Sequence, residues 1–269
     1  MSKSIIVTGA GGGIGESIAR QASSTGYKVG VLDVNKDAAE HVASSLPNAI
    51  ALHASTADPD QVEQALDKFG EAPNALVNNA GIGLSSIREN YYVDNIKFWD
   101  VPEDRWQAIF DVNVRAPFLI SKSAIPHFMK QGWGRIVNVT TSMDTMIRRG
   151  WTPYGPSKGA LEAQSACWSK DCEGSGVSVN VLVPGGPANT AMVPESSSPD
   201  REAMVQPEVM KAPIVWLMSD DSDGFNGNRL TGTGWDKNLS GQVAAEKAAA
   251  PAAWPGAGQQ SVWPDLKPA

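Results

Sequence analysis

Short apolar runs rich in Val and Ile alternate with longer, helix-like stretches along most of the chain. The apolar runs are bounded by Gly, Pro or Asn and have the length of buried strands. They cover residues 4–9, 28–34, 49–55, 74–80, 134–141, 177–185 and 228–234. The helix-like stretches cover residues 13–24, 58–70, 102–130, 158–172 and 207–221. This alternation predicts an α/β fold: a doubly wound parallel sheet of about seven strands with helices on both faces, in three layers α/β/α.

Some segments fall outside this alternation. Residues 82–102 form an aromatic-rich insert after the fourth predicted strand, and residues 186–206 form a loop or lid expected on the substrate side. Residues 236–269 form an Ala/Pro-rich tail that contains Trp254 and Trp263. Indole side chains are unusual in disordered segments. We therefore expect a single domain over residues 1–235, with the tail packed on it or on a neighbouring subunit.

Charge and cysteine content restrict the setting. A net charge of −7 argues against a nucleic-acid partner or an anionic membrane surface. The two cysteines, Cys167 and Cys172, lie in one predicted helix, which favours a reducing compartment without disulfides. No apolar run approaches the length of a membrane span. We expect a cytoplasmic protein, and the scattered histidines predict no metal site.

A glycine-rich turn follows the first predicted strand and opens the first predicted helix, in "VTGAGGGIG". Residues without a Cβ atom let a pyrophosphate approach the backbone, and its charge is stabilised at a helix N-terminus. The turn therefore predicts a Rossmann-type dinucleotide site, although its spacing differs from the common G-x-G-x-x-G. The candidate residues are Gly9, Gly11, Gly12, Gly13, Ile14 and Gly15.

Asp33 ends the second predicted strand, where a carboxylate can accept hydrogen bonds from an adenosine ribose. A 2′-phosphate would meet an uncompensated negative charge there, because neither Val34 nor Asn35 supplies an arginine and Lys36 is the nearest cation. We therefore expect NAD as the cofactor, with NADP the weaker alternative. The competing interpretation is that Asp33 caps the next helix.

The stretch "YGPSK" places Tyr154 and Lys158 four positions apart, with Pro156 between them. Proline is tolerated in a first helical turn, so the stretch alone is consistent with an ordinary helix start. Alternatively, the two side chains lie on one helix face and form an acid–base pair. An adjacent ammonium group favours the phenolate form of a tyrosine.

With "TGAGGGIG", "NNAG", the Asn113 segment "FDVNVRAPF", "YGPSK" and "VPGGPANT" in this order, the chain resembles the short-chain dehydrogenase/reductase family over about residues 4–235. The resemblance implies an NAD(P)-dependent oxidoreductase, a ketoreductase or alcohol dehydrogenase that transfers a hydride between a secondary alcohol and a ketone. It also implies a homo-oligomer, commonly a homotetramer, otherwise a dimer.

The resemblance further implies a role for each matching residue. Tyr154 is the expected general acid–base, Lys158 the expected ribose ligand that lowers the tyrosine pKa, and Asn113 the residue that holds a water in a proton relay. Residues 79–81 are expected on the adenosine side of the cofactor, and the "VPGGPANT" segment beside the carboxamide. The cofactor residues implied in this way are Asn79, Ala80, Gly81, Tyr154, Lys158, Pro184, Gly185 and Thr190.

The chain departs from the family pattern at three places. Thr141 stands where the family usually has the serine that binds the substrate oxygen, and Ser142 follows it. Side chains alternate along a strand, so we favour Thr141 and keep Ser142 as the alternative. Ser55 replaces an aspartate that many relatives carry near the adenine and still offers a hydroxyl acceptor. The threonine of "PGGPANT" comes one residue later than in the commonest spacing, which leaves Thr190 the least secure assignment.

The segments expected around the substrate are rich in apolar and aromatic residues, which suits a bulky or aromatic alcohol or ketone. Arg148 and Arg149 leave an anionic substrate open. Two alternatives for the function are a family epimerase or dehydratase and a non-catalytic NAD(H) sensor. The residues expected to face the substrate include Tyr91, Tyr92, Phe98, Trp99, Met143, Trp151 and Met192.

Overall fold

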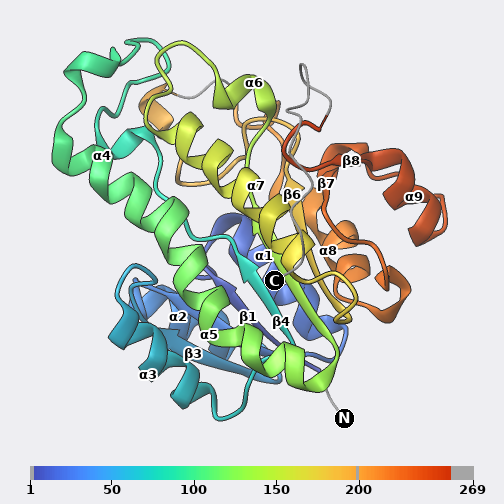
Figure 1. Cartoon of the computed structure of the whole chain (residues 1–269). Coiled ribbons are helices and arrows are strands. Elements are labelled where there is room, and N and C mark those ends of the chain that lie inside the picture. The colour runs from blue at the N-terminus through green and yellow to red at the C-terminus, as the bar shows by residue number, and fades with distance from the viewer. Residues whose placement is uncertain (1–2, 198–199, 256–269) are drawn as a thin grey trace, which may run out of the picture.

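The computed structural model describes residues 3–197 and 200–255 (Figure 1). Within these residues one sheet has the strand order β3-β2-β1-β4-β5-β6-β7-β8. All pairings are parallel except β7 with β8. The strands are β1 (Ser4–Thr8), β2 (Lys28–Asp33), β3 (Ala49–His53), β4 (Ala75–Asn78), β5 (Gly134–Val139), β6 (Val177–Val183), β7 (Asn228–Thr231) and β8 (Ala249–Pro251).

Helices cover both faces of the sheet, because its strands are apolar on both sides. One apolar core lies between the sheet and the face that α1, α2 and α8 cover, and a second lies on the face of α3, α5 and α7. Figure 1 shows α5 and α7 crossing in front of the strands. The helices are α1 (Gly13–Ser24), α2 (Lys36–Ser44), α3 (Pro59–Phe69), α4 (Glu103–Phe110), α5 (Ala116–Gln131), α6 (Met143–Met146), α7 (Tyr154–Asp171), α8 (Lys211–Leu217) and α9 (Gly241–Ala248).

The predicted doubly wound, three-layer fold is confirmed, and all seven predicted strands are present. The described residues add an eighth strand, β8, which the pattern did not predict. It is only three residues long and follows α9, in the segment for which we expected a tail packed on the domain or on a neighbouring subunit. Trp254 lies just beyond β8, whereas Trp263 falls outside the described residues.

Two local features position the functional residues. The stretch predicted as one helix over 102–130 contains a π-helical turn, Asp111–Arg115, between α4 and α5. Such turns are frequent at functional sites, and this one carries Asn113. The carboxyl ends of the parallel strands meet at one edge of the sheet, where a doubly wound fold binds its ligands. In the described part of the chain, no helix is long and apolar enough to cross a lipid bilayer.

Candidate active site

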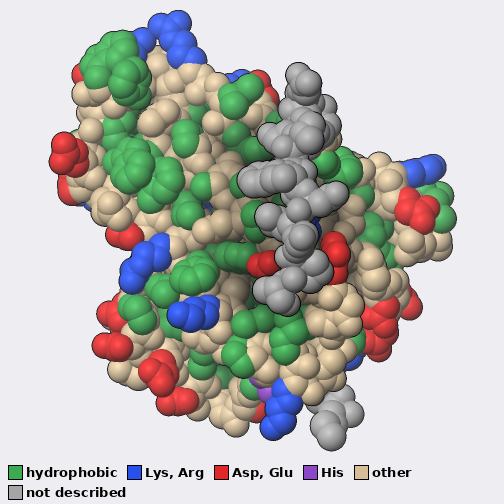
Figure 2. Space-filling model, viewed as in Figure 1, with side chains coloured by type: hydrophobic (Ala, Val, Ile, Leu, Met, Phe, Trp, Pro, Cys, Tyr) green, Lys and Arg blue, Asp and Glu red, His purple; other side chains and the backbone are tan. Residues whose placement is uncertain are grey.

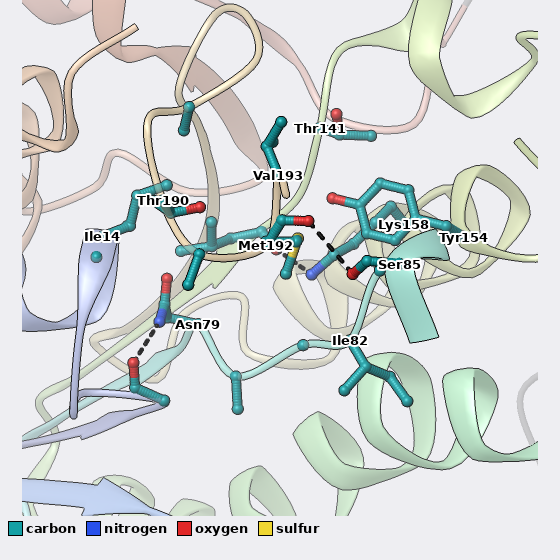
Figure 3. A pocket seen from close by; sticks show the side chains of 18 of the residues that line it. Ile14, Asn79, Ile82, Ser85, Thr141, Tyr154, Lys158, Thr190, Met192 and Val193 are labelled. Carbon is teal, nitrogen blue, oxygen red and sulfur yellow. Dashed lines mark hydrogen bonds between the residues drawn. The ribbon is translucent and has the colours of Figure 1, made fainter. Parts of the chain in front are cut away.

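A cleft of about 910 Å³ lies at the carboxyl ends of the strands. Figure 3 shows Tyr154 and Lys158 in one part of it and Ile14, Asn79 and Thr190 in another. The predicted site residues that line it are Gly9, Gly12, Gly13, Ile14, Asp33, Ser55, Asn79, Ala80, Gly81, Thr141, Ser142, Tyr154, Lys158, Pro184 and Thr190. Segments far apart in the sequence thus meet around one space that is large enough for a cofactor and a small substrate.

The glycine turn has the features of a phosphate cradle. Gly9 has φ of 62°, in the left-handed region that favours glycine. Gly12 is the N-cap of α1 and makes no side-chain cap bond, so the first-turn N–H groups have no side-chain acceptor from that cap. A Cβ atom at Gly12 would meet nothing within 4 Å, which leaves this helix end open to the cleft. The turn therefore fits the pyrophosphate of a dinucleotide.

Thr8, at the end of β1, and Asn79, which follows the adjacent strand β4, hold this turn in place. Asn79 Nδ2 donates to the carbonyl oxygens of Thr8 (3.0 Å) and Gly9 (3.1 Å). Thr8 Oγ1 accepts from the backbone N–H groups of Asn79 and Ala80, both at 3.0 Å. The sequence analysis missed Thr8, although a threonine directly before the glycine turn was a visible signal. The Asn79 side chain positions the loop, in addition to lining the cleft.

Asp33 lies at the end of β2 and lines the cleft. Its two carboxylate oxygens accept from the backbone N–H groups of Gly11 and Asn35, each at 2.9 Å. Asn35 is the N-cap of α2 and its side chain accepts from Ala38 N–H at 3.1 Å. The alternative that Asp33 caps this helix is therefore wrong, and its carboxylate remains at the cleft wall.

Four of the predicted residues do not line the cleft. Gly11 is one, and its N–H group instead holds Asp33. A Cβ atom at Gly15 would overlap the Gly9 carbonyl oxygen, so Gly15 lets α1 pack on the turn. Gly185 has φ of 105° and lies against Thr233, behind the cleft wall. Asn113, the fourth, is fully buried.

Asn113 holds the backbone that leads into the insert. Its Nδ2 donates to Ile82 O and to Ser157 Oγ, both at 3.0 Å. Its Oδ1 accepts from the Ile82 N–H group at 2.9 Å. Asn113 lies in the π-helical turn, and these three bonds all go to residues outside that turn. Asn113 therefore joins the insert to the helix that carries Tyr154.

Tyr154 opens α7, and both Tyr154 and Thr141 line the cleft. Burial, followed by the charge of Tyr92, raises the pKa of the Tyr154 phenol to about 12, while the nearby Thr141 side chain lowers it. Ser142 is occupied elsewhere: its Oγ caps α6 by accepting from Thr145 N–H at 3.3 Å. Thr141, rather than Ser142, is therefore the side chain that acts on the tyrosine pKa.

Lys158 follows one helical turn after Tyr154 and is buried. Its Nζ donates to Val139 O at 2.9 Å. Burial lowers the pKa of Lys158 to about 8, because the charged form loses hydration. A Cβ atom at Gly81 would approach Nζ within 3.4 Å, so the glycine of "NNAG" makes room for this lysine.

Aromatic side chains surround the end of the cleft where Tyr154 lies. The Tyr91 and Tyr92 rings are 4.7 Å apart, and both contact the edge or face of Trp151 at centroid distances of 5.8 and 5.5 Å. Trp151 in turn lies 6.1 Å from the Tyr154 ring. Ser85 Oγ donates to Met192 O at 3.4 Å, which joins the insert to the loop after β6 (Figure 3).

The expected substrate residues divide into two groups. Tyr91, Tyr92, Trp151 and Met192 line the cleft. Phe98 and Trp99 do not; both are 69% exposed, on a short helical turn of the insert, Phe98–Asp100. Met143 and Arg149 are also absent from the cleft wall, whereas Arg148 is part of it. Aromatic content alone could not separate side chains of the insert that face the cleft from those that face solvent.

Comparison with known proteins identifies the family. The family model described as short chain dehydrogenase matches residues 3–201, which is more than half of the chain. The chain therefore belongs to the short-chain dehydrogenase family of oxidoreductases, as its five ordered motifs predicted. A short-chain type dehydrogenase/reductase of Picea abies is 31% identical over 244 residues, which cover 82% of this chain and 87% of that protein.

Solved structures with this fold carry either nicotinamide cofactor. The 3-ketoacyl-(acyl-carrier-protein) reductase of Brucella melitensis, complexed with NADH, is 26% identical with a TM-score of 0.72 and covers 86% of this chain and 94% of its own. A proposed NAD(P)-dependent gluconate 5-dehydrogenase of Beutenbergia cavernae, with NADP bound at low occupancy, is 28% identical with a TM-score of 0.74 and the same coverage. The family relationship thus implies NAD(P) without choosing between the two.

Proposed function

We propose that this chain interconverts a secondary alcohol and a ketone by hydride transfer, with Tyr154 as the general acid–base and NAD as the preferred cofactor. The observation that carries the proposal is the cluster of Tyr154, Thr141 and Lys158 in one cleft with the glycine turn. A bound nicotinamide supplies the hydride acceptor for oxidation or the hydride donor for reduction. The Thr141 hydroxyl orients the substrate oxygen, and Tyr154 takes its proton during oxidation or returns one during reduction. The Lys158 ammonium favours the phenolate that accepts this proton.

A panel of alcohols tests this function and the substrate class together. Formation of the reduced cofactor is measured with sec-phenethyl alcohol, sec-butanol and mandelate, each with NAD⁺ and with NADP⁺. The aromatic wall of the cleft predicts the highest kcat/KM for the aromatic, uncharged alcohol. A preference for mandelate would instead assign Arg148 to a substrate carboxylate. No reduced cofactor with any alcohol, or with the matching ketones in reverse, would contradict the proposed activity.

The two candidate hydroxyl groups give separable predictions. Thr141→Ala is expected to lower kcat strongly because it removes the hydroxyl that we propose orients the substrate oxygen, whereas Thr141→Ser keeps the hydroxyl and has a mild effect. Ser142→Ala removes the cap of α6 and is expected to cost about 1 kcal/mol of stability with little change in kcat. Steady-state kinetics and thermal unfolding of the three variants check this. A larger loss of kcat in Ser142→Ala than in Thr141→Ala would reverse the assignment.

Cofactor preference depends on the charge at Asp33. Among the described residues that line the cleft, the cations are Lys158 and Arg148, and neither is next to Asp33 in the chain. We expect Asp33→Ser with Val34→Arg to shift the NAD/NADP ratio of kcat/KM towards NADP. Removing a like-charge contact worth several kcal/mol corresponds to a change on the order of 10²-fold. Val34 is 68% exposed, so the arginine fits without repacking. An unchanged ratio would show that another residue selects the cofactor.

We also propose that the protein forms a homo-oligomer, a tetramer or dimer. Figure 2 shows hydrophobic side chains gathered over α4 and the insert, and Trp106, Phe118 and Met129 on α4 and α5 are 40–42% exposed. Phe118→Lys is expected to lower the sedimenting mass, because it puts a charge into the apolar contact. Ser44→Lys adds the same charge on exposed α2 and is the matched control. A monomeric wild-type protein in sedimentation velocity would contradict this proposal.

A further inference from the structure

Thr141 lies beyond the regular hydrogen bonding of its strand. The register of β5 with β6 ends at Val139 opposite Leu182, and the following residue, Thr140, still donates its N–H group to Leu182 O at 3.2 Å. The Thr141 carbonyl oxygen instead accepts from Arg229 Nη2 at 3.0 Å. This arginine comes from β7, two strands away in the sheet. The side chain of a residue far along the sequence therefore supplies the hydrogen bond to Thr141, where the regular bonding between β5 and β6 ends.

Arg229 is itself fixed by a buried carboxylate. Its Nε donates to Glu162 Oε1 at 2.8 Å, and the Glu162 side chain is completely buried in the middle of α7. The other oxygen, Oε2, accepts from Thr140 Oγ1 at 3.0 Å. One ion pair thus holds both threonines, Thr140 by its side chain and Thr141 by its backbone.

The C-terminal segment covers this ion pair. The Ala253 N–H group, two residues beyond the end of β8, donates to Glu162 Oε1 at 3.4 Å. Ala253 and Trp254 have φ of 57° and 52°, a conformation that non-glycine residues rarely adopt. Ala252 is buried in an apolar cluster on β6. The strained turn therefore places a backbone donor on Glu162, where it adds a further bond to the buried charge.

Holding the Thr141 backbone also sets its hydroxyl. Threonine is β-branched, so its χ1 angle has few allowed values and the side chain follows the backbone closely. An ion pair buried in this way costs desolvation free energy, and well-packed apolar residues of similar size often serve stability equally well. Because this ion pair holds the backbone of Thr141, whose side chain lowers the Tyr154 pKa, stability alone does not account for it.

We propose that Arg229, held by Glu162, is a positioning residue that fixes the Thr141 hydroxyl against Tyr154. This inference rests on the proposed acid–base function of that pair. The competing explanation is that the ion pair only braces α7 against the sheet. The two differ in what happens when both charges are replaced together by apolar side chains, because bracing then survives and the donor to Thr141 O does not.

The test uses the full-length double variant Glu162→Leu/Arg229→Met. We expect it to fold with a Tm close to that of the wild type and to bind NADH with an unchanged dissociation constant. Its kcat with sec-phenethyl alcohol is expected to fall on the order of 10²-fold, as for a catalytic group displaced by about 1 Å. The single variant Arg229→Lys retains a donor and is expected to keep an intermediate kcat. The acidic limb of the pH profile for oxidation should move to higher pH, because the Tyr154 pKa loses the lowering effect of Thr141.

A second readout does not depend on activity. The methyl NMR signal of Thr141, identified by its loss in Thr141→Ser, reports the side-chain rotamer. It should show one rotamer in the wild type and rotamer averaging in the double variant. The control is Arg135→Met/Asp223→Asn, which removes the ion pair of another buried arginine at the opposite end of β5 and should change neither readout.

The outcomes separate this inference from the proposed function. A double variant with wild-type kcat, or with an unchanged Thr141 methyl signal, would overturn the positioning role. If the wild type oxidises no alcohol while the methyl signal still depends on Arg229, the proposed function fails and the Arg229–Thr141 link stands. A double variant that does not fold would show that the pair is needed for stability and would also count against the proposal, provided that the control pair folds.

Discussion

Replacing Tyr154 by phenylalanine is expected to lower kcat roughly 10²–10⁴-fold, the usual contribution of a positioned acid–base group. The dissociation constant of NADH should not change, because the ring and its packing against Trp151 are retained and only the hydroxyl is lost. Stopped-flow turnover and NADH fluorescence titration measure the two quantities. The matched control is Tyr27→Phe. This change removes a hydroxyl that donates to Met218 O, and Tyr27 directly precedes β2 and does not line the cleft.

If Tyr154→Phe kept near-normal kcat with cofactor bound, Tyr154 would be only the first residue of α7. Equal losses in Tyr154→Phe and Tyr27→Phe would point to a general effect of losing a buried hydroxyl. Either outcome would remove the basis for assigning acid–base chemistry to this cleft.

Lys158→Met is expected to lower turnover and weaken NADH binding while making the fold more stable. The variant loses the ammonium that favours the Tyr154 phenolate and the expected contact to the nicotinamide ribose. Burial lowers the pKa of Lys158 from 10.5 to about 8, so the charged form is disfavoured in the folded state. A shift of this size corresponds to on the order of 3 kcal/mol at neutral pH, and removing the charge should recover part of it.

The lowered pKa of Lys158 also makes the free energy of unfolding depend on pH. Between pH 8 and 10.5 the unfolded chain keeps the Lys158 proton and the folded chain has lost it. The unfolded state then binds more protons, so the contribution of Lys158 to the free energy of unfolding rises with pH in this window. Denaturant titrations at several pH values should show a smaller rise in Lys158→Met than in the wild type. Identical slopes would show that the lysine is not desolvated as its burial implies.

The sheet, the glycine turn and the Tyr154–Lys158 pair could be predicted from the sequence, because each depends on local signals. Buried parallel strands are nearly continuous apolar runs, and the glycine turn and the Tyr154–Lys158 spacing lie within single segments. Strand β8 could not be predicted, because three residues are too few to show a periodic pattern. The π-helical turn at Asn113 could not be predicted either. Its sequence has ordinary helical periodicity, and only the hydrogen-bond pattern distinguishes it from an α-helix.

Long-range pairings were beyond sequence reasoning for a different reason. Glu162 and Arg229 are 67 positions apart, and each alone resembles a surface charge. Only the order of strands in the sheet brings them together behind Thr141. The insert shows the same limit, since Tyr92 and Trp99 have similar sequence surroundings but only Tyr92 lines the cleft.

Hydride transfer itself can be followed with a deuterium label. The wild-type protein is incubated with NAD⁺ and sec-phenethyl alcohol that carries deuterium on the carbinol carbon, and the mass of the reduced cofactor is determined. The account predicts NADH that contains the deuterium, with little or none formed by Tyr154→Phe in the same time. Unlabelled NADH, or equal labelling by Tyr154→Phe, would contradict direct hydride transfer with Tyr154 as the acid–base.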